Sequence, residues 1–336
     1  MTPFSDRTQC ALPARGHRPS PAKRQLLWML AALAPVSPAL AADERFPVDP
    51  HQVVYESWSG AGLRGPLGIA VDGARGEVLV ANTNGHRVEI YDLDGFPIGA
   101  FTHVVDGPTG TGLDGCPKWL AVDSAGRILV VDQLAPYVDV VDYAGRPVGR
   151  LTLPAPDDVI SAGGGPGAVT VARDGRILVA SRGDAGRIHE FDADYAFVRA
   201  WGDSGTAPGR LSRITGLGET PEGDVLVTCV GTELAVQTFD ADGQFIRGHG
   251  RHDVGSGNFS FPSGIAVTAD GRVWVSDEIR QIVQVFDAAG SYLGAVGGPG
   301  RGLGEFLYPS AVATDGHDLL AVAERGGNRF QILKLR

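Results

Sequence analysis

The sequence predicts an all-β protein built as a six-bladed β-propeller, and three observations support this fold class. A unit recurs from Gly68, Trp119, Ala168, Gly216, Gly264 and Ala311, with starts 47 to 51 residues apart. Each unit holds four short apolar runs separated by turns rich in Asp and Gly. The chain contains 48 glycines and 22 prolines without a low-complexity tract, as expected for a turn-dense folded protein. A repeat of this length with four strands per unit is typical of propeller blades.

Residues 1–41 have the composition of a secretory signal peptide. Basic residues from Arg15 to Arg24 precede an apolar stretch at 26–36, and Ala39 and Ala41 occupy the small-residue positions of a cleavage site. A membrane anchor is the alternative, but the apolar stretch is short for a bilayer of roughly 30 Å and contains Pro35. We therefore expect an exported protein, periplasmic or extracellular, whose mature chain has no membrane span.

The charge of the predicted mature chain argues against binding to nucleic acid. Residues 42–336 contain 24 basic and 38 acidic residues, a formal charge of −14. Such a surface repels polyanions. Two cysteines remain after the leader, Cys116 and Cys229. They lie in non-adjacent units, so we expect two free thiols.

Unit five shows the expected strands most clearly. Its apolar runs are 264–267, 273–276, 282–286 and 292–296, joined by turns such as Ala269-Asp270-Gly271. The unit is thus an antiparallel meander, and six such sheets packed radially bury most of their faces. We predict one propeller domain over 42–336, with blades starting near 65, 116, 165, 213, 261 and 308.

The last unit ends at Arg336 after three runs, without a fourth strand. Near the N-terminus, "QVVYESWSG" at 52–60 matches the fourth-strand pattern of "YLGAVGGPG" from Tyr292. We expect this N-terminal strand to complete the last blade, which closes the ring and leaves neither terminal blade with a long unpaired edge.

These repeats resemble those of the NHL-repeat family. The likeness is carried by "GHRVEIYDLDG" from Gly85, "GNRFQILKL" from Gly327 and "FPSGIAVTADGRVWVSD" from Phe261. The resemblance implies a six-bladed propeller over essentially the whole mature chain. It does not specify a function, because propellers serve as binding proteins, scaffolds, lyases and hydrolases.

One face of the predicted propeller collects the long loops. In a meander blade, the blade-to-blade linkers and the loops between second and third strands lie at the same end of the ring. We call this end the working face. It receives the linkers 102–116, 153–165, 202–213, 250–261 and 297–308, and long loops on a rigid scaffold are common binding sites.

Polar residues end the second strand of most blades, at Asn82, Asp132, Ser181, Cys229, Asp277 and Glu324. If Asn82, Asp132, Asp277 and Glu324 converge on the axis, they could hold calcium or zinc, and the protein would be a metal-dependent lyase or hydrolase, as in the gluconolactonase- and paraoxonase-like propellers that the architecture resembles. The alternative, which we favour, is that each side chain bonds a neighbouring loop.

Histidines near the working face could form a zinc site of the kind found in the amidating lyases, which are similar six-bladed propellers. His86, His103, His249 and His252 lie there, but none recurs at a position expected to face the channel. His86 belongs to the repeat signature, which favours a structural role. The pair in "HGRH" (249–252) sits in a glycine-rich loop and is a weak metal signal.

Aromatic and basic residues gather on the working face, a mixture common in protein and peptide contact sites. The candidates are Lys118, Trp119, Tyr137, Arg182, Arg187, Arg213, Arg280 and Arg325. The sequence therefore favours a non-catalytic binding or scaffold module without a cofactor, for a protein or peptide partner outside the cytoplasm. The metal-dependent enzyme is the alternative.

Overall fold

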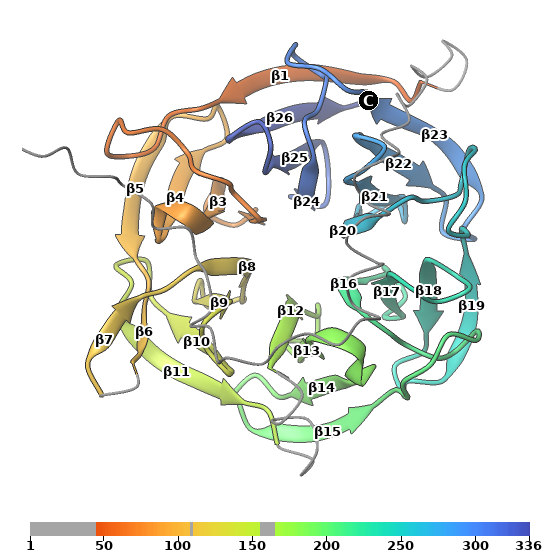
Figure 1. The fold of residues 1–336 in the computed structure, drawn as a ribbon, viewed down its shortest axis with the longest axis horizontal. Coiled ribbons are helices and arrows are strands. Elements are labelled where there is room, and N and C mark those ends of the chain that lie inside the picture. The colour runs from red at the N-terminus through yellow and green to blue at the C-terminus, as the bar shows by residue number, and fades with distance from the viewer. Residues whose placement is uncertain (1–44, 108–109, 155–164) are drawn as a thin grey trace, which may run out of the picture.

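The computed structural model describes residues 45–107, 110–154 and 165–336. Six four-stranded antiparallel sheets stand around a central axis, as Figure 1 shows. The prediction of an all-β six-bladed propeller is therefore confirmed. The predicted leader at 1–41 lies outside the described residues, and no described helix has the length and apolar character needed to cross a membrane.

The first three blades follow one another from the innermost strand outward. Their strands are β2 (Gly68–Asp72), β3 (Glu77–Asn82), β4 (Arg87–Asp92) and β5 (Pro97–Thr102); β8 (Pro117–Val122), β9 (Ile128–Asp132), β10 (Tyr137–Val141) and β11 (Pro147–Thr152); and β12 (Pro166–Val171), β13 (Ile177–Ser181), β14 (Ile188–Phe191) and β15 (Phe197–Trp201). A small hairpin of β6 (Val104–Asp106) and β7 (Gly112–Asp114) is inserted in the linker between blades 1 and 2.

The other three blades repeat this order. Their strands are β16 (Ile214–Glu219), β17 (Val225–Cys229), β18 (Val236–Phe239) and β19 (Phe245–His249); β20 (Pro262–Val267), β21 (Val273–Asp277), β22 (Ile282–Phe286) and β23 (Tyr292–Gly297); and β24 (Pro309–Thr314), β25 (Leu319–Glu324), β26 (Arg329–Leu335) and β1 (Val48–Val54). The strands expected in unit five agree with β20 to β23 within two residues at each end.

The ring closes through the N-terminal strand, as predicted, but that strand begins earlier in the sequence. Strand β1 pairs antiparallel with β26, from Val48 opposite Leu335 to Val54 opposite Phe330. We predicted residues 52–60. After Val54 the chain instead turns away, because the Tyr55 carbonyl accepts a hydrogen bond from the Leu63 N–H. The sequence match had included this exit turn.

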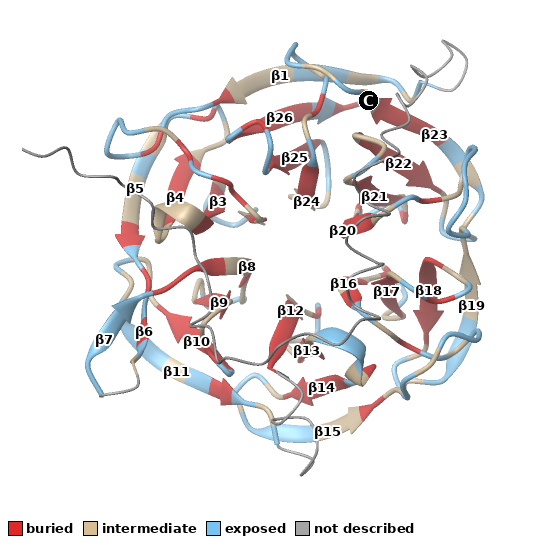
Figure 2. Ribbon diagram, viewed as in Figure 1, coloured by how far each residue is buried: buried red, intermediate tan, exposed pale blue. Residues whose placement is uncertain are grey.

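Burial is concentrated between blades. Figure 2 shows the second and third strands of the blades as mainly buried, and the outer strands as mostly intermediate or exposed apart from β23. The apolar clusters join neighbouring sheets; one of them includes Leu79 and Ile90 of blade 1 with Leu120 and Val130 of blade 2. This packing fixes each blade against the next and positions the ends of the strands at the channel.

The two cysteines differ from expectation in one respect. Cys229 is free and buried, as predicted. Cys116 is disulfide-bonded, so the prediction of a free thiol there is wrong. Because Cys229 is free, the two do not bridge each other.

Candidate functional site at the channel mouth

One residue at the start of each innermost strand forms a ring at the working face; it is the second residue of the strand in blades 2 to 6 and directly precedes β2 in blade 1. The ring consists of Leu67, Lys118, Gly167, Thr215, Ser263 and Ser310, and all six line one cavity. Glu278, just after the second strand β21, lines the same cavity. Linker ends and second-to-third-strand loops thus share one face, as the strand order predicted.

Three of these ring residues join adjacent blades through hydroxyl groups. Thr215 donates to the Pro262 carbonyl at 2.8 Å, Ser263 to the Pro309 carbonyl at 2.8 Å, and Ser310 to the Pro66 carbonyl at 2.9 Å. We call this contact the hydroxyl clasp. It explains why a small hydroxyl residue recurs there in blades 4 to 6.

In blade 1 the clasp is replaced by another donor. Leu67 has no polar hydrogen to donate, and Thr83 in the short 3-10 turn η2 (Thr83–Gly85) donates to the Pro117 carbonyl at 2.8 Å instead. At the junction of blades 2 and 3, the equivalent carbonyl is that of Pro166, and it accepts a hydrogen bond from Arg182 at 3.3 Å. Lys118 is therefore not required for the clasp, and its side chain is available for another role.

Lys118 carries an ammonium group without a counter-ion. It is half-buried, and among the described residues no hydrogen bond or ion pair to its ammonium is present. Burial, with the positive charge of Arg182 as a second cause, lowers its pKa. A buried cation that lacks a partner is costly, so this group is a candidate binding residue.

The next position on the innermost strands is small in five blades and large in one. It is Gly68, Ala168, Gly216, Gly264 or Ala311 in those five. Crowding explains the glycines, because a Cβ at Gly68 would lie 2.4 Å from the Lys118 carbonyl oxygen. Blade 2 has Trp119 here, which packs against apolar clusters of blades 1 and 6, blades 2 and 3, and blades 3 and 4. The indole therefore reaches across the channel.

The mouth cavity measures about 200 Å³, and its lining is more apolar than polar. Lys118 lies on blade 2 and Glu278 on blade 5, on opposite sides of the ring (Figure 1). Glu278 accepts a hydrogen bond from Arg325. Burial raises the Glu278 pKa against the opposing effect of Arg325.

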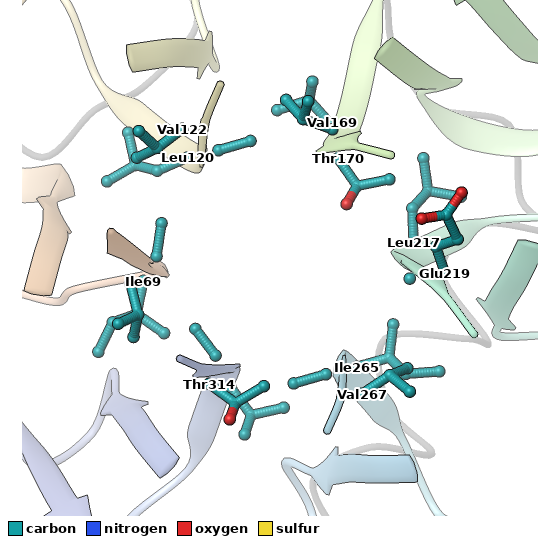
Figure 3. Close-up of a pocket in the computed structure, with 18 of the residues that line it drawn as sticks. Ile69, Leu120, Val122, Val169, Thr170, Leu217, Glu219, Ile265, Val267 and Thr314 are labelled. Carbon is teal, nitrogen blue, oxygen red and sulfur yellow. The ribbon is translucent and has the colours of Figure 1, made fainter. Parts of the chain in front are cut away.

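A second cavity of about 260 Å³ lies further along the channel. Figure 3 shows its walls, with Ile69, Leu120, Leu217 and Ile265 around a common space. Among the described lining residues, Trp119 alone is shared by both cavities. Trp119 thus marks the boundary between the mouth cavity and the channel cavity.

The comparisons with known proteins agree with this architecture. The NHL repeat family model matches residues 63–91 and 259–286. The chain thus carries matches to the NHL repeat in blades 1 and 5 of a six-bladed β-propeller. No curated protein matches its sequence significantly.

Solved structures resemble the propeller in fold. A virginiamycin B lyase from Staphylococcus aureus is 17% identical with a TM-score of 0.55, over 81% of this chain and 95% of the other. A gluconolactonase from Xanthomonas campestris is 18% identical with a TM-score of 0.59, over 87% and 98%. A protein of unknown function from Bacteroides thetaiotaomicron is 16% identical with a TM-score of 0.64, over 85% and 73%. At these identities the likeness concerns the fold alone.

Two of the predicted metal ligands, Asn82 and Asp132, bond to nearby groups. Asn82 accepts the Arg64 N–H at 2.8 Å and donates to Glu89 at 3.1 Å. Asp132 accepts the Leu134 N–H at 2.8 Å and lies 2.9 Å from the His103 ring. Both side chains hold loops of blades 1 and 2.

Asp277 and Glu324 do the same in blades 5 and 6. Asp277 accepts the N–H groups of Ser260 at 2.7 Å and Phe261 at 3.1 Å. Glu324 accepts the Leu307 N–H and the Arg329 guanidinium, both at 2.7 Å. Among the described residues, no group of three or more His, Cys, Asp and Glu is arranged to hold a metal. The structure thus places the four predicted ligands in loop contacts and does not bring them together.

The predicted binding residues differ in their contacts. Three have structural contacts: Tyr137 accepts the Asp106 N–H at 3.0 Å, Arg182 donates to three carbonyls at 3.0 to 3.3 Å, and Arg280 donates to the Gly255 and Asn258 carbonyls at 2.8 and 2.7 Å. Arg187 and Arg213 are exposed, and Arg325 pairs with Glu278. Lys118 and Trp119 line the mouth cavity.

Sequence reasoning missed Glu278 and the hydroxyl clasp. The signal was present in the repeat alignment, where the residue pairs Ile-Thr, Pro-Ser and Pro-Ser open blades 4 to 6 but Pro-Leu, Pro-Lys and Pro-Gly open blades 1 to 3. Comparison of the second residue of each pair across the six units shows that only blade 2 has a charged residue there, Lys118.

His103 forms a buried charge network rather than a metal site. Its Nδ1 lies 2.9 Å from Asp132 and its Nε2 lies 3.2 Å from Asp139, which also accepts from Arg150 at 3.0 Å. Burial acts to lower the His103 pKa, but hydrogen bonds to the two carboxylates prevail and raise it to about 9. This imidazolium fixes the start of the linker that leads into blade 2.

Proposed function

We propose that this NHL-repeat propeller is an exported, non-catalytic binding module whose working face receives a protein or peptide partner. The observation that carries the proposal is the mouth cavity, where Lys118 and Trp119 are larger than the residues at the same positions in most other blades. Neither residue is needed for the hydroxyl clasp. Residues that depart from a structural repeat at the lining of a cavity are candidates for function.

Exposed apolar side chains in loops of the working face also support a macromolecular partner. Ile279 is 47% exposed in the loop after β21, Tyr308 is 42% exposed just before β24, and Leu303 is 50% exposed in the linker between them. With the exposed Arg187 and Arg213, they supply the mixture of apolar and cationic groups that peptide contacts use.

A metal-dependent lyase or hydrolase is the second candidate. It is favoured by the resemblance in fold to a virginiamycin B lyase and a gluconolactonase. The loop contacts of Asp132, Asp277 and Glu324 weigh against it, because a metal would have to compete with hydrogen bonds that these oxygens already accept. Turnover of a lactone that depends on added calcium or zinc would favour this candidate.

The experiment is a selection from a random peptide library with free carboxyl ends against the immobilised mature protein. We expect enriched peptides whose binding is lost in the double variant Ile279→Asp and Tyr308→Asp. The matched control is Ile98→Asp with Ile246→Asp, which alters exposed residues of the outer strands. If no peptide is enriched, or if the enriched peptides bind both variants equally, the proposal is wrong.

Export has its own test. Residues 1–46 fused to a reporter enzyme that is active only after export should give activity, because the basic and apolar segments are those of a signal peptide. The same fusion with charged residues in the apolar stretch should be inactive. A reporter that is inactive in both fusions would contradict export.

A further inference from the structure

An aromatic side chain lies at the inner end of the mouth cavity. Trp119 lines both the mouth cavity and the channel cavity beyond it, and it contacts clusters that belong to blades on several sides of the axis. A chain that enters from the working face therefore meets an indole floor. An internal peptide segment would have to turn back within the cavity, whereas a chain end can simply stop there.

The cavity has one unmatched charge. Glu278 is paired with Arg325, and Arg182 donates to the carbonyls of Asp132, Gln133 and Pro166. Lys118 has no such partner among the described residues. A ligand with a negative charge would supply the missing counter-ion, while a second cation would be repelled by Lys118 and Arg182.

The volume and walls limit what can enter. About 200 Å³ is smaller than the roughly 300–1,000 Å³ of sites for drug-sized ligands. The walls include Leu67, Ile214 and Phe261 in addition to Trp119. The space suits a single apolar or aromatic residue rather than a longer segment.

We propose that the mouth cavity binds the C-terminal residue of a peptide, with the terminal carboxylate at Lys118 and the apolar side chain against Trp119 and Phe261. The inference rests on the proposed function and names the part of the partner that is recognised. Of the two ends of a chain, the carboxyl end carries the charge that Lys118 lacks. An amino end would place a third cation beside Lys118 and Arg182.

The test uses three defined probes in titration calorimetry with the mature protein. They are the N-acetylated peptide Ala-Ala-Phe with a free carboxylate, the same peptide with a C-terminal amide, and 3-phenylpropionate. We expect the free acid to bind at least about tenfold more tightly than the amide, because a hydrogen bond between charged groups is replaced by a neutral contact.

Two variants locate the effect. Lys118→Ser reproduces the residue found in blades 5 and 6, so it is compatible with the fold, and it should weaken binding of the acid at least about tenfold. Lys334→Ser, on the exposed side of β26, is the matched control and should leave binding unchanged. Trp119→Ala reproduces the residue of blades 3 and 6. It should also weaken binding of the peptide acid, because it removes the indole that the apolar side chain contacts.

Each result decides the inference. It is overturned if the amide binds as well as the acid, or if Lys118→Ser binds like the parent protein. It is also overturned if 3-phenylpropionate binds as tightly as the peptide acid, because the cavity would then recognise a free carboxylic acid. If library peptides bind the working face equally well as acids and amides, the binding module stands and the C-terminal inference alone fails.

Discussion

Blades 4 to 6 and blades 1 to 3 differ in the third-strand residue that contacts neighbouring loops. In blades 4 to 6 a third-strand glutamine holds the incoming linker. Gln237 accepts from Gly209 at 2.7 Å, Gln284 from Gly257 at 3.0 Å and Gln331 from Gly304 at 2.8 Å, and each amide also donates to a linker carbonyl. The hydroxyl clasp occurs in the same three blades.

In blades 1 to 3 the equivalent residues are Glu89, Asp139 and His189. Glu89 accepts the Trp58 N–H at 3.0 Å, Asp139 joins the His103 network, and His189 lies 3.0 Å from Ser181. The repeat is thus conserved within the chain where it only holds loops, and it varies in the half that contributes Lys118 and Trp119 to the mouth. The difference indicates that blades 1 to 3 are the specialised half.

The largest expected effect compares two equivalent arginines, Arg329 in blade 6 and Arg87 in blade 1. Arg329 is 1% exposed and bonds Glu324 at 2.7 Å, the Tyr55 hydroxyl at 2.8 Å and linker carbonyls. Arg329→Ala leaves Glu324 buried without its cation and should cost about 3–5 kcal/mol of unfolding free energy. Urea unfolding measures it.

Arg87→Ala is the matched comparison. The Arg87 side chain is 29% exposed and its closest carboxylate contact is 3.9 Å from Glu89, so we expect a cost of about 1 kcal/mol. Equal losses in the two variants would contradict the distinction that we draw between blades 1 and 6.

The second prediction concerns pH and the His103 network of blade 2. The folded pKa of His103, about 9, is above the ordinary value of about 6.5, so the folded state keeps a proton that the unfolded state loses. The stabilisation is therefore complete below about pH 6.5 and is lost as pH rises toward 9, by up to about 3 kcal/mol. Urea unfolding between these pH values should show this decline.

His103→Gln is the variant that isolates the effect. Glutamine has no proton to lose in this range, so the variant should be less stable at pH 6.5 and should show little further decline. If the variant and the parent protein lose stability in parallel, His103 is not the group responsible.

The repeats made the fold predictable, whereas the site depended on single exceptions. Blade boundaries follow from the turns and apolar runs, which are local signals present six times. The closing strand was misplaced because its exit at Tyr55 depends on a hydrogen bond to Leu63, a contact that no pattern encodes. The metal hypothesis treated Asp277 as facing the axis, but the side chain turns to the N–H groups of Ser260 and Phe261.

The third prediction tests the glutamine contact of the regular half. Gln284→Ala leaves the Gly257 N–H without the acceptor that holds it at 3.0 Å, and it removes one of the two donors to the Asn258 carbonyl, which keeps its bond from Arg280. We expect a loss of about 1 kcal/mol in unfolding free energy, because two hydrogen bonds of partly buried groups are lost. Gln244→Ala, in an exposed turn of blade 4, is the control and should change stability little.

The smallest expected effect is that of chelator, and it applies to both halves equally. Asn82 and Asp132 in blades 1 and 2 and Asp277 and Glu324 in blades 5 and 6 all accept hydrogen bonds from loop groups. If these loop contacts are the role of the four side chains, plasma mass spectrometry of the mature protein should detect no stoichiometric calcium or zinc. Chelator should then leave the melting temperature unchanged. A bound metal whose removal lowers the melting temperature, with Asp132→Asn and Asp277→Asn both abolishing it, would mean that the two halves share a central site. The function would then depend on that ion rather than on Lys118 and Trp119.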